Sequence, residues 1–331
     1  MGRLRERLAK SDVRSSVPLG WLERAARDLD PSVEHVGDGL VRPNGNEAPT
    51  TLRVVPADLV CDDGQRITDV VEICTPLGGE LASLDDDWVT ALNRVASLSA
   101  LVRGGDSGQL EIRSRLTCYA GDDEAWRIYA PLVVHALVHQ YERVRFAAAS
   151  IRDGDFSPAA AQSPDPSAWA GSQLLGTLGF LRQRGWFANG DGRAVTVEFP
   201  WDPGAISALQ RLADPLCEGV RTSLLQLGTG GPLDWFGPGL SAELSLPVQT
   251  DGPATELAAY LNAREAAARD AVPFFGAWTA NPDHCHPSFV CFWPNAVWNP
   301  GNAINLAVWM KARSDHARDW LEGGAGEGFV H

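Results

Sequence analysis

The densest group of reactive side chains is Asp283-His284-Cys285-His286, which Cys291 follows closely. Histidine and cysteine at this density can hold zinc. On an extended segment alternate residues point to opposite faces, so His284 and His286 can converge while Cys285 faces away. The CxxC pair that is typical of structural zinc sites is missing from the sequence. We therefore favour a β-hairpin turn and predict neither a metal nor a cofactor, with a zinc site or a Cys–His pair as the alternative.

Other patterns that could carry chemistry have simpler structural interpretations. His135 and His139 have the helical spacing that lets two rings share a metal. The residues between them lack the glutamate of a HExxH protease, so we interpret them as core or groove-edge histidines. The acidic runs 85–87 and 122–124 each precede an expected helix, where carboxylates cap the first turn. We assign no catalytic residue and favour a noncatalytic protein.

Composition narrows the functional classes. The 331 residues are 44% hydrophobic and 21% charged, which is typical of globular domains, and the net charge is −14. Such acidity disfavours nucleic-acid binding, because it repels phosphates. The longest apolar run, 130–138, is too short to cross a bilayer, and no signal peptide is recognisable. With six scattered cysteines, these features predict a cytoplasmic protein without membrane contact.

Hydrophobic periodicity predicts a similar series of elements in each half of the chain. In the first half we expect strands at 51–55 and 69–74, a helix at about 85–103, a strand at 109–119 and a long helix from about 123. The second half has expected helices at 174–185, at 254–271 and from about 301 through 320. Its expected strands are 194–199, 223–227, 240–246, 274–280 and 288–293.

The predicted fold class is α+β, with two related units, each an antiparallel sheet with helices mainly on one face. We place the N-terminal unit at 1–152 and the C-terminal unit at 171–322. Residues 153–170 between them are dominated by Pro, Ser, Ala and Asp, and they predict a linker. The glycine-rich residues 323–331 predict a flexible tail.

The order of these elements resembles the YbjN-like and type III secretion chaperone fold. The matching residues are Leu92-Asn93 and Leu261-Asn262, each on a helix that leads into a strand and then a closing helix. The likeness covers most of 17–146 and 173–321. It implies noncatalytic binding of an extended or partly unfolded polypeptide, in bacterial secretion or conflict (defence) systems. Many relatives are single units that dimerise, so self-association of this linked form is left open.

Tryptophan usage indicates where a client polypeptide would bind. Aromatic residues are common anchors at protein interfaces, and they are also ordinary core residues. Because Phe292 and Trp293 are adjacent on a strand, they must face opposite sides of the sheet. The predicted client-binding residues are Trp235, Phe236, Trp278, Phe289, Phe292, Trp293 and Trp298. We therefore predict a client-specific chaperone or adaptor. The alternatives are a cryptic hydrolytic or zinc enzyme near Asp283 and Cys291, or a structural subunit of a larger complex.

Overall fold

Within its described residues the protein consists of helices and two antiparallel sheets of six strands each, so the predicted α+β class is confirmed. The computed structural model describes residues 17–60, 66–95, 98–104, 108–121, 125–152, 168–201, 221–229, 239–248, 254–268, 272–280, 286–294 and 301–322. The predicted tail and residues 153–167 of the predicted linker lie outside these ranges, and helix α5 begins at Ala168.

The first unit runs from α2 to α4. Its helices are α2 (Leu19–Leu29), the short 3₁₀ helix η1 (Gly79–Ser83), α3 (Asp86–Val95) and α4 (Ala125–Arg152). Its strands are β1 (Glu34–Val36), β2 (Gly39–Asn44), β3 (Glu47–Val60), β4 (Arg66–Pro76), β5 (Ala100–Gly104) and β6 (Gln109–Tyr119). Buried and more exposed residues alternate along most of β4, as expected for a strand whose two faces differ in burial.

The second unit repeats this order. Its helices are α5 (Ala168–Gln183), α7 (Ala254–Ala267) and α8 (Asn302–Glu322). Its strands are β7 (Phe187–Gly190), β8 (Ala194–Pro200), β9 (Thr222–Thr229), β10 (Gly239–Ser245), β11 (Ala277–Ala280) and β12 (Pro287–Pro294).

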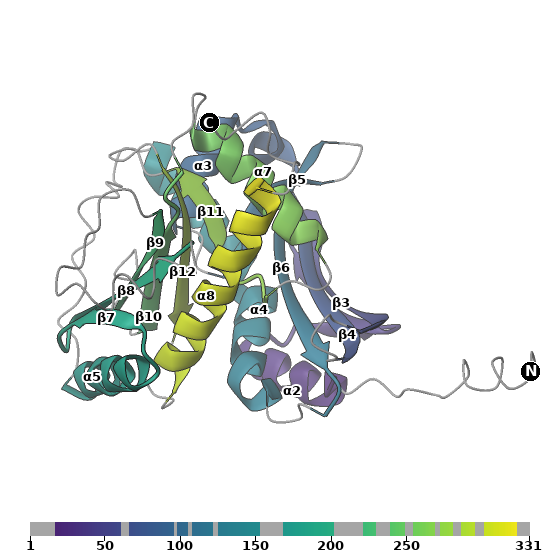
Figure 1. Ribbon diagram of the computed structural model, residues 1–331. Coiled ribbons are helices and arrows are strands. Elements are labelled where there is room, and N and C mark those ends of the chain that lie inside the picture. Colours follow the sequence, from purple (N-terminus) through teal and green to yellow (C-terminus); the bar gives the residue numbers. More distant parts are fainter. Residues whose placement is uncertain are drawn as a thin grey trace, which may run out of the picture.

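The two sheets have the same topology. The first has the order β1-β2-β3-β4-β6-β5, and the second, traced from β7, has the order β7-β8-β9-β10-β12-β11. In both units the first helix contacts the last, α2 with α4 and α5 with α8. Figure 1 shows the two sheets on opposite sides of the molecule, with α3 and α7 together at one end. The predicted internal duplication is therefore present at the level of every strand and its neighbours.

One predicted element differs from the structure. We expected a helix over 85–103, but α3 ends at Val95 and β5 occupies Ala100–Gly104. Apolar side chains continue through this stretch and mimic helical periodicity. Pairing of β5 with β6 stabilises the strand, because Leu101 lies opposite Ile112 in the ladder. Pairing with β6, rather than the local apolar pattern, therefore determines the conformation of Ala100–Gly104.

The Leu-Asn dipeptides perform the same structural task in both units. Asn93 of α3 donates from Nδ2 to the carbonyl of Leu101 (3.1 Å), and its Oδ1 accepts from the Leu101 N–H (2.7 Å). Asn262 of α7 makes the same two bonds with Trp278, both at 2.8 Å. All four of these residues are buried. Each asparagine thus ties a helix to the edge strand that follows it.

The two units contact each other through α3 and α7. Helix α3 contacts β11 of the second unit, α7 contacts β5 of the first, and α3 and α7 contact each other. The Thr279 hydroxyl donates to the Thr90 carbonyl across this junction (3.1 Å). Arg115 of β6 forms a two-way backbone bridge with Phe274, with N···O distances of 3.1 and 2.8 Å. One hydrophobic cluster runs through both units.

A buried ion pair lies at the same junction. Arg313 of α8 donates from Nε to Glu265 Oε1 of α7 (2.8 Å), and both side chains are at most 2% exposed. The Trp278 indole N–H donates to Glu265 Oε2 (2.7 Å). The Arg313 guanidinium also lies 3.6 Å from the centre of the Phe289 ring. Both carboxylate oxygens therefore have partners, as a buried charge requires.

Candidate functional site

The predicted client-binding aromatics fall into two groups. Trp235, Phe236 and Trp298 lie outside the described residues. Trp278, Phe289, Phe292 and Trp293 are each at most 1% exposed. Trp278 and Phe289 pack edge to face at the unit junction, whereas Trp293 packs on Trp309 of α8 with ring centres 4.8 Å apart. These four side chains are core residues here, and their role in client binding stays a prediction.

The His/Cys group is described only in part. Asp283, His284 and Cys285 lie outside the described residues. His286 Nδ1 is 2.9 Å from the Val248 carbonyl, and burial raises the pKa of the Cys291 thiol to about 12. A thiol with that pKa is protonated at neutral pH and is a poor nucleophile or metal ligand. Within the residues that the structure describes, no cluster of three His, Cys, Asp or Glu side chains is arranged to hold a metal ion.

His135 and His139 lie side by side on α4, with ring centres 5.3 Å apart, over a shallow hollow beside Arg143. Burial lowers the pKa of His135 to about 4, and His139 and Arg143 add a smaller effect in the same direction. Burial also lowers the pKa of His139. Both rings are therefore neutral at pH 7.

This pair predicts acid sensitivity. The unfolded chain binds a proton at His135 below about pH 6.5, but the folded chain does so only near pH 4. The free energy of unfolding should therefore fall as the pH drops from 6.5 towards 4, by about 1–2 kcal/mol after allowing for the partial exposure of the ring. Urea unfolding at pH 7.0 and 4.5 measures this loss. His135→Leu should make the loss smaller, and an unchanged loss in that variant would contradict the assignment.

An open cleft of about 570 Å³ lies in the first unit. It lies between α3 and α4 and is bounded by η1 and by the turn that joins β2 to β3. Its apolar lining consists of Leu81, Leu84, Trp88, Tyr141 and Ala148. Its polar lining consists of Asn44, Asn46, Glu47, Glu80, Arg145 and Arg152. An apolar interior with a few polar groups at the rim is the usual make-up of a binding pocket.

Local hydrogen bonds fix two walls of this cleft. Asn44 ends β2 and donates to the Ala48 carbonyl (2.8 Å) and to the Thr50 hydroxyl (3.1 Å), which holds the β2–β3 turn. Asp85 accepts from the backbone N–H of Trp88 (2.9 Å) and so caps α3. Gly78 approaches Glu47 so closely that a Cβ there would lie 2.7 Å from its carboxylate. The cleft is therefore shaped before any ligand arrives.

The charged rim is held only loosely. Arg152 pairs with Glu80 at 2.9 Å and Arg145 with Glu142 at 3.6 Å, and all four side chains are well exposed. Exposed ion pairs contribute at most about 1 kcal/mol. These arginines can therefore turn towards a ligand at small cost.

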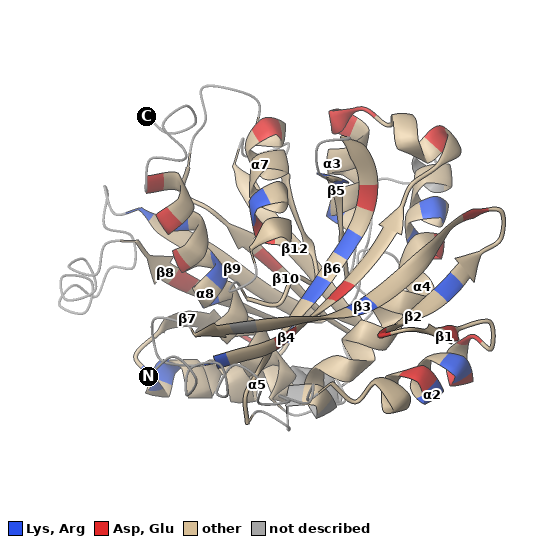
Figure 2. Cartoon of the chain, turned by 90° about the vertical axis from the view of Figure 1, so that its right-hand side faces the viewer, with Lys and Arg blue, Asp and Glu red and all other residues tan. Residues whose placement is uncertain are grey.

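A second hollow, of about 340 Å³, lies over β3, β4 and β6. Figure 2 shows acidic and basic residues interspersed along β6 and its neighbouring strands. Within this hollow Arg113 pairs with Glu111 at 2.6 Å. Burial, with help from Glu111, raises the pKa of the Cys74 thiol to about 11, so the thiol stays protonated at neutral pH. Because acidic and basic side chains both line this hollow, it has no clear preference for a cationic or an anionic ligand.

The cleft was not predicted from the sequence. Its lining comes from the β2–β3 turn, η1, α3 and α4, which are far apart in the sequence. A usable signal was the glycine pair Gly78-Gly79, because Gly79, the first residue of η1, has φ +55, which favours glycine.

Known proteins give no further guide to this site. Among the described helices, none combines the length and apolar character needed to cross a membrane. Comparison of the chain with protein-family models, with curated proteins and with solved structures finds no match.

Proposed function

We propose that the protein is a noncatalytic, cytoplasmic chaperone or adaptor that binds a specific client polypeptide, in a secretion or defence setting. The observation that carries this proposal is the preformed cleft between α3 and α4. Its apolar lining can cover a client side chain that would otherwise be exposed to water. Burying one large apolar side chain contributes about 1.5–3 kcal/mol, so several such contacts along a segment are needed for tight binding.

The sheet edges support the same proposal. The inner edge strands, β5 and β11, are contacted by helices of the opposite unit. The outer edge strands are β1 and β7, and all three residues of β1 are exposed. An exposed sheet edge can accept an extended client strand through main-chain hydrogen bonds. A client would then be held by backbone pairing at an edge and by side chains in the cleft.

A substitution in the cleft tests the proposed function. Leu84 lies in the loop between η1 and α3 and is only partly buried, so Leu84→Glu should leave the fold intact. The expected result is at least a tenfold loss of a polypeptide that co-purifies from the native host, because a carboxylate would enter the apolar interior. The matched control is Leu175→Glu on α5, where the leucine is well exposed and does not line the cleft. Equal recovery of the client with both variants would exclude the cleft as its binding site.

A further inference from the structure

Because the two units correspond strand by strand, the strand pair and the last helix that border the first-unit cleft can be compared with those of the second unit. The β2–β3 pair corresponds to β8–β9, and α4 corresponds to α8. The cleft lies where the end of the β2–β3 pair approaches the C-terminal half of α4. In the second unit the same place lies between the end of the β8–β9 pair, at Trp201 and Arg221, and the C-terminal half of α8.

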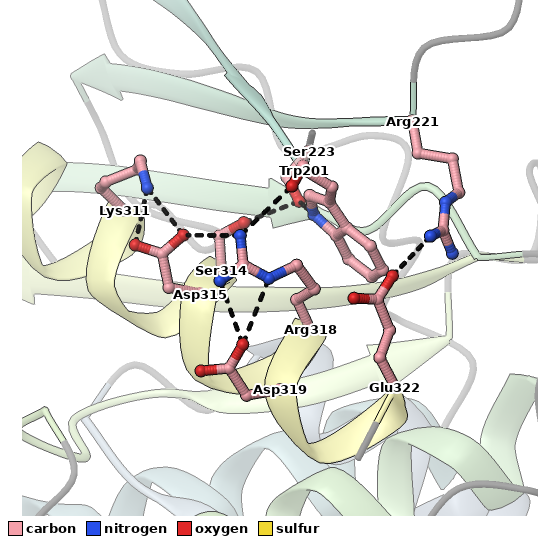
Figure 3. Close-up of polar contacts among 9 residues, drawn as sticks. All are labelled: Trp201, Arg221, Ser223, Lys311, Ser314, Asp315, Arg318, Asp319 and Glu322. Atoms are coloured by element: carbon pink, nitrogen blue, oxygen red, sulfur yellow. Dashed lines mark hydrogen bonds and ion pairs between the residues drawn. The ribbon is translucent and has the colours of Figure 1, made fainter. Parts of the chain in front are cut away.

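In the second unit a side chain of the protein itself, that of Trp201, lies between this strand pair and α8. Trp201 follows β8 and is only 5% exposed. Its indole N–H donates to the Ser223 hydroxyl (2.6 Å), which also accepts from the Ser314 hydroxyl of α8 (2.8 Å). Figure 3 shows the indole between the strands and α8, within a group of charged residues. The polar edge of the ring is satisfied and its apolar faces are covered.

Charged residues hold the ring in place. The Arg221 guanidinium lies 5.3 Å from the ring centre of Trp201 and forms an ion pair with Glu322 at the end of α8. Arg318 donates to the Trp201 carbonyl (3.3 Å) and pairs with Asp319 at 3.0 Å. An arginine over an aromatic face is a favourable arrangement. The second unit therefore contains an aromatic side chain seated between a strand pair and a helix, with an arginine above it.

We propose that Trp201 occupies the place in the second unit that corresponds to the open cleft of the first unit. The cleft then binds one aromatic side chain of a client polypeptide, and each copy of the protein has one such site. This inference rests on the proposed function, and it adds the chemical class of the bound side chain and the number of binding sites per chain. The first-unit cleft has the matching parts: an apolar interior, the polar side chain of Asn44 beside the Thr50 hydroxyl, and rim arginines on α4. Arg145 takes the role of Arg221 and covers the bound ring.

The direct test is ¹⁹F NMR titration of the full chain with acetyl-Gly-Ser-(5-fluorotryptophan)-Ser-Gly-amide as the probe. The expected result is one site per chain, with at least tenfold weaker binding of matched probes that carry 4-fluoroleucine or 3-fluoroalanine at the same position. Leu84→Glu should remove that site, and Leu175→Glu should keep it. Equal binding of the three probes, or wild-type binding that Leu84→Glu leaves unchanged, would overturn the inference.

Removing the Trp201 side chain from the second unit tests the inference independently. Trp201→Ala should add a second site for the fluorotryptophan probe, whereas Trp201→Leu should keep the place filled and add none. A folded Trp201→Ala chain, verified by circular dichroism, that still binds one probe would overturn the correspondence. If neither variant folds, the preference of the wild type among the three probes still decides the case. A client lost from Leu84→Glu, together with no aromatic preference, would refute this inference and leave the proposed function standing.

Discussion

Replacing Arg313 with methionine should lower the free energy of unfolding by about 3–5 kcal/mol, because it leaves the Glu265 carboxylate buried without its charge partner. The carboxylate would keep only the Trp278 indole N–H on its other oxygen. The loss also removes the bond from Arg313 to the Pro273 carbonyl (2.7 Å), which holds the segment before β11. Urea unfolding followed by circular dichroism at pH 7 measures the effect.

Two further variants show whether charge burial is the cause. The double variant Glu265→Leu with Arg313→Met should recover much of the loss, since a buried pair replaced by apolar groups of similar size is often neutral. Arg152→Ala breaks the exposed pair with Glu80 and should cost less than about 1 kcal/mol. If Arg313→Met costs no more than Arg152→Ala, the junction does not depend on this ion pair.

Asn262→Leu should cost about 2–4 kcal/mol. The side chain has a similar size, but the backbone N–H and carbonyl of Trp278 both lose their partner inside the core. Each unsatisfied buried group costs about 1–3 kcal/mol. Asn93→Leu should have an effect of the same size on Leu101. The same urea titration serves for both variants.

The matched control for these variants is an asparagine outside the core. Asn189 on β7 is exposed and accepts a bond from Arg182, so Asn189→Leu should change the free energy of unfolding by less than about 0.5 kcal/mol. A large loss at Asn262 with none at Asn93 would mean that the two units no longer depend on equivalent contacts.

Most of the fold was predictable because its signals are local. Alternation along β6 and the helical stripes of α4 and α7 identified those elements, and the Leu-Asn dipeptides marked equivalent positions. β5 was predicted as helix, because its conformation is set by the ladder with β6 and by the bonds from Asn93. The hydrophobic pattern of a single sequence does not show which strands pair with each other.

The surroundings of the predicted client-binding aromatics were harder to predict, because they depend on what covers each face of a sheet. From the sequence, Phe292 and Trp293 were expected to face opposite sides of the sheet, and both a core role and an interface role were left open. Both residues are at most 1% exposed. Trp293 packs on Trp309 of α8, and on the other side Phe292 lies so close to Gly239 that a Cβ there would be 2.3 Å from its ring. Both faces of β12 are therefore covered, which the order of elements does not reveal.

The contacts of α3 and α7 with the opposite unit have a consequence for synthesis on the ribosome. The inner edge of the first sheet, β5, is contacted by α7, whose residues 254–267 are made long after β5. Until α7 has been made, β5 of a nascent first unit lacks this contact. Uncovered strand edges readily pair with other chains. A chain that stops short of α7 would therefore keep this edge of the sheet open to pairing with another chain.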